Sequence, residues 1–211
     1  MSIYCLDGCQ GGHWMNFKDL IYHGTEERNL EYKSSMSWND ISTKTKVVIA
    51  CLAIANIPDG GTLIFGEDEI SKGVFKANGM REEEADSFNQ DDISNYVNGY
   101  ADPYVDIKVN RENDDGKAFI IIQIQEFSEL PVVCKKDGDK GIRIGAIYTR
   151  PRRKVESVPV PSQNEMREII DLAVDKKMRK IQENLFKWGI RTDQIYQVTN
   201  DDKFDEQLGG L

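Results

Sequence analysis

Hydrophobic and polar residues along the chain alternate with two periods, one typical of helices and the other of strands. Helical spacing of apolar residues predicts helices at residues 16–23, 40–56 and 82–100. Alternating patterns and short apolar runs predict strands at residues 29–33, 62–65, 104–109, 117–125, 132–134 and 142–149. The turn signal Asn113 to Gly116 predicts a hairpin. These elements predict an α/β (α+β) fold with a mixed, largely antiparallel sheet packed by helices.

The C-terminal part of the chain has a different pattern. Two prolines within Val158–Pro161 predict a linker, and residues 164–188 then predict a long amphipathic helix. Its apolar stripe consists of Met166, Ile169, Ile170, Ala173, Val174, Met178, Ile181 and Leu185. The stripe could pack on its own domain or on a second copy, and we expect a homodimer. The predicted organisation is a flexible leader at 1–14, a domain at 15–157, and a linker, helix and tail at 158–211.

Composition and charge exclude several classes of protein. The 211 residues carry a net charge of −9, which excludes a uniformly basic nucleic-acid coat protein but allows local basic patches. The longest apolar run, Val47 to Ala55, is far shorter than the ~20 residues of a membrane span. The N-terminus lacks the pattern of a secretion signal, and four cysteines are too few for a disulfide scaffold. We therefore expect a cytoplasmic protein without a membrane partner.

Carboxylates near two predicted strands form the first candidate site. Glu26 and Glu31 lie five residues apart, and Lys33 shares a strand face with Glu31. Asp68 and Glu69 follow the buried strand at 62–65. Oxygen ligands from two segments suit Mg²⁺ or Mn²⁺, and a lysine beside them suits a phosphate, as in metal-assisted phosphodiester chemistry. The alternative is a set of acidic surface residues on short turns.

A basic segment forms the second candidate site. Residues 132–155 contain eight basic and two acidic residues, a local charge of +6. The predicted nucleic-acid contacts are Lys33, Lys135, Lys136, Arg143, Tyr148, Arg150, Arg152, Arg153 and Lys154, where the arginines and lysines would bind phosphates and Tyr148 would stack on a base. The alternative is an ordinary solvated turn.

Cysteine and histidine offer little further chemistry. Cys5, Cys9 and His13 resemble part of a metal clip, but a credible fourth ligand is missing, so no zinc is expected. With only two histidines in the chain, a histidine-based nucleophile triad is not expected either.

Four segments together resemble the Schlafen-type AlbA-like domain, as found in single-lobe bacterial members and in animal Schlafens. They are GTEERNLEYKSS, IACLAIANIPDGGTLIFGEDE, ELPVVCKKDG and IRIGAIYTRPR, and they span roughly residues 17–153. The resemblance implies a mixed α/β fold that binds nucleic acid. In nuclease members it implies a three-carboxylate metal site that cuts structured RNA, chiefly transfer RNA.

The resemblance also assigns site residues. The paired glutamates fall on Glu26 and Glu31, and the third acid falls on Glu69 by ungapped counting or on Asp68 by chemistry. Two positions depart from the pattern, because Glu67 replaces the usual hydrophobic residue and Glu69 the usual aspartate. The longer arm at position 69 changes the geometry available to a metal.

Two main functions follow for this chain. The first is a divalent-metal-dependent endoribonuclease acting on structured RNA such as tRNA. Glu26, Glu31 and Asp68 or Glu69 would hold Mg²⁺ or Mn²⁺, and Lys33 would contact the scissile phosphate. The second is a non-catalytic DNA- or RNA-binding module or transcriptional regulator. Both have a nucleic-acid partner, with RNA favoured over DNA. A purely structural role through the terminal helix is the third possibility.

Overall fold

The computed structural model describes residues 16–189 of the chain. Its helices are α1 (Phe17–Ile21), α2 (Ile41–Ala55), α3 (Glu82–Ala85), α4 (Gln90–Asn98), the 3₁₀ turn η1 (Asp139–Gly141) and α5 (Gln163–Lys187). Its strands are β1 (Leu30–Lys33), β2 (Gly61–Phe65), β3 (Glu67–Ser71), β4 (Val74–Ala77), β5 (Ala101–Asp102), β6 (Ile107–Asp114), β7 (Lys117–Ile124), β8 (Val133–Cys134), β9 (Tyr148–Thr149) and β10 (Val158–Pro159). The predicted leader with Cys5, Cys9 and His13, and the tail beyond residue 189, lie outside the described residues.

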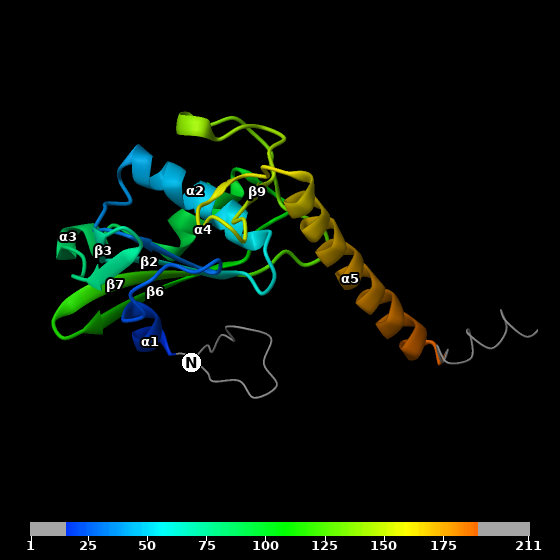
Figure 1. Cartoon of the computed structure of the whole chain (residues 1–211), viewed down its shortest axis with the longest axis horizontal. Helices are drawn as coiled ribbons and strands as arrows, with labels where there is room; N and C mark the ends of the chain where they lie inside the picture. The colour runs from blue at the N-terminus through cyan, green and yellow to red at the C-terminus, as the bar shows by residue number, and fades with distance from the viewer. Residues whose placement is uncertain (1–15, 190–211) are drawn as a thin grey trace, which may run out of the picture. The chain divides into compact units, whose positions relative to one another are not determined.

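A four-stranded sheet in the order β1-β2-β7-β6 forms the centre of the domain (Figure 1). The pair β1–β2 is parallel, and the pairs β2–β7 and β7–β6 are antiparallel. The remaining strands form three two-stranded sheets, β3–β4, β5–β8 and β9–β10. The architecture confirms the predicted α+β class with a mixed, largely antiparallel sheet.

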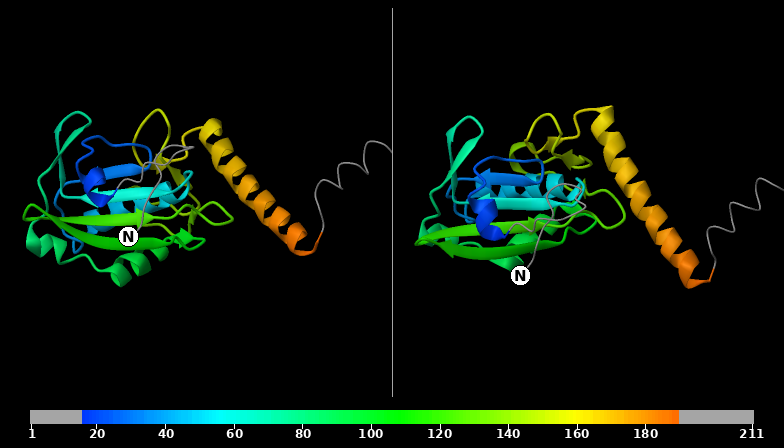
Figure 2. Two further views of the ribbon diagram at one scale, coloured as in Figure 1. Left: turned by 90° about the horizontal axis from the view of Figure 1, so that it is seen from below. Right: turned by 60° about the horizontal axis from the view of Figure 1, so that its bottom comes forward.

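Helices cover both faces of the sheet, as Figures 1 and 2 show for α1 and α2. The second half of α2 is apolar all round, and its residues from Val47 to Ala55 are buried apart from the partly exposed Ile49. On the opposite face, α1 contributes Leu20 and Ile21 to a cluster with Tyr32 of β1. Because side chains alternate along a strand, Glu31 and Lys33 point to the α2 side while Leu30 and Tyr32 point to the α1 side.

Asn56 fixes the end of α2 against two distant segments. Its side-chain amide is buried and donates hydrogen bonds to the carbonyls of Leu52 (3.1 Å), Val132 (2.8 Å) and Tyr148 (3.0 Å). Its Oδ1 accepts from the backbone N–H of Val132 at 2.7 Å. These four bonds satisfy backbone groups that burial would otherwise leave unpaired. They hold β9, and therefore Arg150 just after it, beside α2.

The structure differs from the sequence-based prediction in four elements. The predicted helix at 82–100 is two helices, because Asn89 caps α4 by accepting from the N–H groups of Asp91 and Asp92. The predicted strand at 142–149 is reduced to β9, and the predicted linker begins with β10, which pairs with β9. The hairpin β3–β4 was not predicted, because only short, mostly polar stretches flank its turn at Gly73.

The chain divides into two compact units after Ile169. The first contains the sheet, its helices and the first turns of α5, where Ile169 is buried. The second contains the rest of α5, whose side chains Ile170, Val174, Met178 and Ile181 are 40–53% exposed. Within residues 16–189 none of the helices is long and apolar enough to cross a membrane.

Candidate functional site

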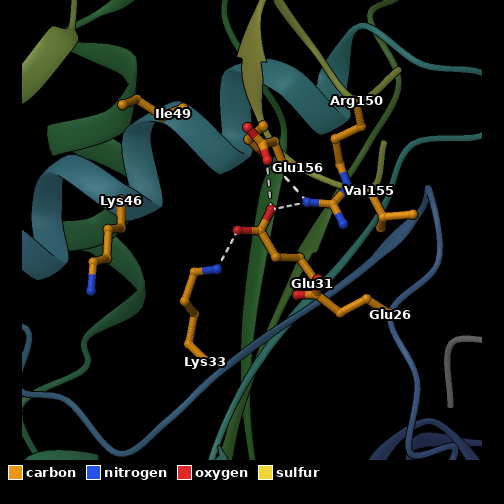
Figure 3. Close-up of a pocket in the computed structure, with 9 residues that line it drawn as sticks. Glu26, Glu31, Lys33, Lys46, Ile49, Arg150, Val155 and Glu156 are labelled. Atoms are coloured by element: carbon orange, nitrogen blue, oxygen red, sulfur yellow. Dashed lines mark hydrogen bonds and ion pairs between the residues drawn. The ribbon is translucent and has the colours of Figure 1, made fainter. Parts of the chain in front are cut away.

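A pocket of about 330 Å³ lies on the α2 side of β1 (Figure 3). Its lining comes from β1 and the turn before it, from α2, and from the segment after β9. The lining residues are Glu26, Glu31, Lys33, Lys46, Ile49, Arg150, Val155, Glu156 and Ser157. The structure therefore brings together three residues of the predicted carboxylate site, Glu26, Glu31 and Lys33, and adds Arg150 from the predicted basic segment.

Glu31 is the central residue of this pocket, and cations occupy both of its carboxylate oxygens. Oε1 forms an ion pair with Lys33, and Oε2 forms one with Arg150 and accepts a 2.8 Å hydrogen bond from Ser157. The residue is only 6% exposed. Burial alone would raise the pKa of Glu31, but the charges of Lys33 and Arg150 outweigh burial and hold this pKa below its usual value.

Arg150 is a buried structural residue, which corrects its prediction as a surface phosphate contact. Its side chain is completely buried. The guanidinium donates to the carbonyls of Arg28 (2.8 Å) and Glu27 (3.1 Å) as well as pairing with Glu31. A guanidinium with these partners is committed to the turn before β1, so it is not available to a backbone phosphate.

Glu26 lies beside Glu31 but is held differently. Its Oε1 accepts a 2.9 Å hydrogen bond from the backbone N–H of Tyr32. Burial raises the pKa of Glu26 despite that hydrogen bond and the nearby charge of Lys33. The two glutamates of the pocket therefore have pKa values shifted in opposite directions. Ionised Glu31 and the more readily protonated Glu26 meet at one pocket wall.

Asp68 and Glu69 do not join the pocket. Asp68 accepts a 2.7 Å hydrogen bond from Asn78, and Glu69 accepts one of 2.9 Å from the N–H of Gly73, both within the β3–β4 region. Among residues 16–189 no three acidic, histidine or cysteine side chains are grouped so as to hold a metal ion. With Glu31 bound by two cations and the third acid elsewhere, the donor set of the pocket does not fit a divalent cation.

The first half of the basic segment lies on the surface. Lys135, Lys136 and Arg143 are exposed in the loop from β8 to β9, and the ammonium of Lys136 lies 4.2 Å from the ring centre of Tyr100. Tyr148 is not exposed, which corrects its prediction as a base-stacking residue. It is 1% exposed, and its hydroxyl donates to the carbonyl of Gly141 and accepts from the N–H of Arg143.

The second half of the basic segment is exposed but partly neutralised by acidic partners. Arg152, Arg153 and Lys154 are all exposed. Arg152 pairs with Glu168 at 2.8 Å, and Lys154 pairs with Glu156 at 2.8 Å. The surface charge of this stretch is therefore smaller than the sequence count implies.

Five of the pocket residues were not predicted from the sequence: Lys46, Ile49, Val155, Glu156 and Ser157. For Lys46 a signal existed, because the polar stretch Ser42 to Lys46 is the one polar part of an otherwise apolar α2. For Ser157 and for the partnership of Arg150 with Glu31 no local signal existed. More than 115 residues separate each of them from Glu31, so only the tertiary fold reveals the contact.

Glu67, at the start of β3, is a second buried carboxylate outside the pocket. It is 1% exposed, and neither of its oxygens meets a hydrogen-bond donor within the described part of the chain. Burial, helped by the charge of Asp68, raises the pKa of Glu67 to about 8. The position is the one at which the Schlafen-like pattern has a hydrophobic residue, and the environment of Glu67 suits such a residue.

We predict that removing either partner of the Glu31–Arg150 pair destabilises the fold strongly. Glu31→Gln or Arg150→Met should each lower the free energy of unfolding by about 3–5 kcal/mol, because each leaves a buried group without its partner. The double variant should lose clearly less than the sum of the two. Because the pKa of Glu31 is lowered on folding, its contribution is present above pH ~4.5 and lost as the pH falls below that value.

Urea unfolding of the two variants and the double variant measures this coupling. Glu156→Gln, which breaks the exposed pair with Lys154, is the matched control and should change stability by less than about 1 kcal/mol. Strictly additive losses would contradict the predicted interaction.

We predict that Glu67→Val stabilises the protein at pH 8 and has a much smaller effect near pH 5. Because folding raises the pKa of Glu67 from 4.5 to about 8, its favourable contribution exists below pH 4.5 and is lost as the pH rises to 8. The gain at pH 8 should be roughly 2 kcal/mol, from removing an unpaired buried carboxylate. Unfolding curves at both pH values measure it. The exposed Glu69→Val is the control, and an equal gain at both pH values would show that Glu67 does not titrate as described.

Comparison with known proteins identifies the family. The sequence model of the family described as Schlafen, AlbA_2 matches residues 26–159, more than half of the chain and including the whole pocket lining. No curated protein matches the chain.

Two solved structures are similar to part of this chain. The DIP2311 protein of Corynebacterium diphtheriae is 15% identical with a TM-score of 0.47, over 72% of this chain and 27% of that one. The N-terminal domain of a Nitrosomonas europaea protein named for its relation to the ATP-dependent DNA helicase RecG is 23% identical with a TM-score of 0.39, over 61% of this chain and 88% of that one. This chain thus spans about a quarter of the first structure. The family match is the decisive finding: the chain belongs to the Schlafen, AlbA_2 family.

Proposed function

We propose that this protein binds nucleic acid, with RNA as the preferred ligand, and does so without metal-dependent cleavage. The observation that carries the proposal is the commitment of both Glu31 oxygens to Arg150 and Lys33. A carboxylate that completes a buried ion-pair network supports the fold, whereas a metal ligand must offer free oxygen lone pairs. This favours the binding module over the nuclease.

Cations on the α2 side supply the proposed phosphate contacts. Lys46 is exposed on α2, whereas Lys33 of β1 is half-buried at the pocket, where it pairs with Glu31. The loop that carries Lys135 and Arg143 includes η1, which packs on α2. Lysine and arginine bind phosphates of any sequence, so this surface would position a nucleic acid without reading its bases.

We predict that Lys135→Gln/Arg143→Gln weakens RNA binding in EDTA by about tenfold, as expected from losing two phosphate contacts. It should also reduce the salt slope of the logarithmic affinity by about two units, because each contact releases about one counterion. Fluorescence anisotropy with labelled tRNA, and with a DNA duplex for comparison, measures both.

The matched control is Lys72→Gln/Lys76→Gln, which removes the same charge from the β3–β4 hairpin. It should leave affinity and slope close to the wild-type values. Equal losses in the two double variants would mean that net charge, and not this surface, governs binding.

The competing proposal is the metal-dependent endoribonuclease. It is supported by the presence of Glu26, Glu31 and Lys33 in one pocket, and it would require Glu31 to exchange its cationic partners for Mg²⁺ or Mn²⁺. It would also require β3 to bring Asp68 or Glu69 to the pocket. Incubation of tRNA with the protein and Mn²⁺ separates the two proposals. Cleavage that disappears with Glu26→Gln would overturn the binding-only function.

We also propose that the protein is a homodimer through α5. Ile170, Val174, Met178 and Ile181 form an exposed apolar stripe. The helix is charged asymmetrically, with Asp171 and Asp175 in its first half and a basic second half of Lys176, Lys177, Arg179, Lys180 and Lys187. An antiparallel pairing with a second copy would bury the stripe and place opposite charges beside each other.

Light scattering at micromolar concentration should give twice the mass of the 24.0 kDa chain. Val174→Glu should convert the dimer to a folded monomer, because it places a charge in the apolar stripe. The exposed Ile144→Glu, in the loop between β8 and β9, is the control and should remain dimeric. A wild-type mass near 24 kDa would contradict the dimer.

A further inference from the structure

Two arginines converge on one carboxylate at the start of α5. Arg28 donates to both oxygens of Glu168, with Nη1 at 2.7 Å from Oε1 and Nη2 at 2.9 Å from Oε2. Arg152 donates to Oε1 from Nε at 3.1 Å and from Nη2 at 2.8 Å. One oxygen of Glu168 thus accepts from three guanidinium N–H groups. This arrangement of planar, bidentate donors suits a phosphate group as well as a carboxylate.

The arginine pair is joined to the wall of the candidate pocket. Nε of Arg28 donates to the carbonyl of Arg150 at 2.7 Å, and Nε of Arg150 donates to the carbonyl of Arg28 at 2.8 Å. This reciprocal pair of hydrogen bonds fixes Arg28 next to the residue that binds Glu31. Arg28 and Glu168 are each partly exposed, and Arg152 is 74% exposed, so solvent and ligands reach the cluster.

We propose that Arg28 and Arg152 form a binding site for a phosphate of the nucleic-acid backbone, and that Glu168 occupies this site as an internal competitor. The inference rests on the proposed nucleic-acid binding and extends it to a specific contact. The first turns of α5 would then be autoinhibitory, because a phosphate can reach both arginines only when Glu168 moves away.

The chemistry of Glu168 fits the role of a competitor. Hydrogen bonds from Arg28, together with those from Arg152, lower the pKa of Glu168 to about 2 although burial opposes the shift. Glu168 therefore stays ionised at every physiological pH, and only another anion or a movement of α5 can displace it. Ile169, the next residue, is buried and holds this turn of α5 on the domain.

Glu168→Gln tests the proposal, because it removes the competing charge while keeping the helix and the shape of the side chain. We expect tRNA affinity in EDTA to rise about three- to tenfold and the salt slope to steepen by about one unit. Adding Arg152→Gln to this variant should abolish the gain in affinity, because it removes one of the two proposed phosphate ligands. Arg152 is exposed, so its loss should not unfold the protein. The control is Glu165→Gln, an acid of the same turn that accepts its hydrogen bond from Ser162.

Inorganic phosphate provides a second probe that does not depend on nucleic-acid binding. Millimolar phosphate should raise the melting temperature of Glu168→Gln more than that of the wild type, at constant ionic strength. Phosphate stabilisation without any RNA binding would support the anion site but overturn the proposed function. RNA binding and phosphate response that are the same in Glu168→Gln and wild type would overturn this inference and leave the proposed function intact. If Glu168→Gln fails to fold, Glu168→Asp takes its place, because the shorter side chain withdraws the carboxylate from the two arginines while keeping the charge. RNA affinity and stabilisation by phosphate are then measured on Glu168→Asp, with the same outcomes for and against the proposal.

Discussion

The buried ion pair between Arg150 and Glu31 is the interaction on which the rest of the site depends. It joins β1 to a residue 119 positions later, and Arg150 also holds the carbonyls of the turn before β1. Taking two charges out of water is costly, so such a pair persists only when further hydrogen bonds complete it. Ser157, Lys33 and the backbone of residues 27 and 28 supply those bonds. The pocket therefore takes its shape from a network that also holds the domain together.

This network determines which chemistry the pocket can support. An ionised Glu31 with cationic partners on both oxygens makes the pocket a charged, hydrogen-bonded surface, whereas a divalent cation would need those oxygens for itself. The nearby Glu26 is shifted the other way by burial, and Asp68 and Glu69 lie in the β3–β4 hairpin. Glu67, whose position suits a hydrophobic residue, adds an unpaired buried carboxylate to that same hairpin. The acid-rich stretch from Glu67 to Glu69 thus lies outside the pocket lining.

The sequence predicted those parts of the molecule that depend on local pattern. The alternation of Leu30, Glu31, Tyr32 and Lys33 placed the two charged residues on one face, and the apolar run of α2 identified the central helix. What it could not predict depends on long-range contacts. Tyr148 and Arg150 look like surface residues within a basic stretch, yet Asn56 holds β9 against α2 and buries both. Similarly, nothing local indicates that Arg28 and Arg152 meet at Glu168, because the two arginines lie 124 positions apart in the sequence.

We propose that Arg150, and not a metal ion, is the functional partner of Glu31. The most direct measurement is an anomalous difference map from crystals soaked in manganese. We predict no peak between Glu26 and Glu31, and density for the Arg150 guanidinium on the Glu31 carboxylate. A manganese peak within about 2.2 Å of oxygens from both glutamates, with Arg150 displaced, would contradict the account.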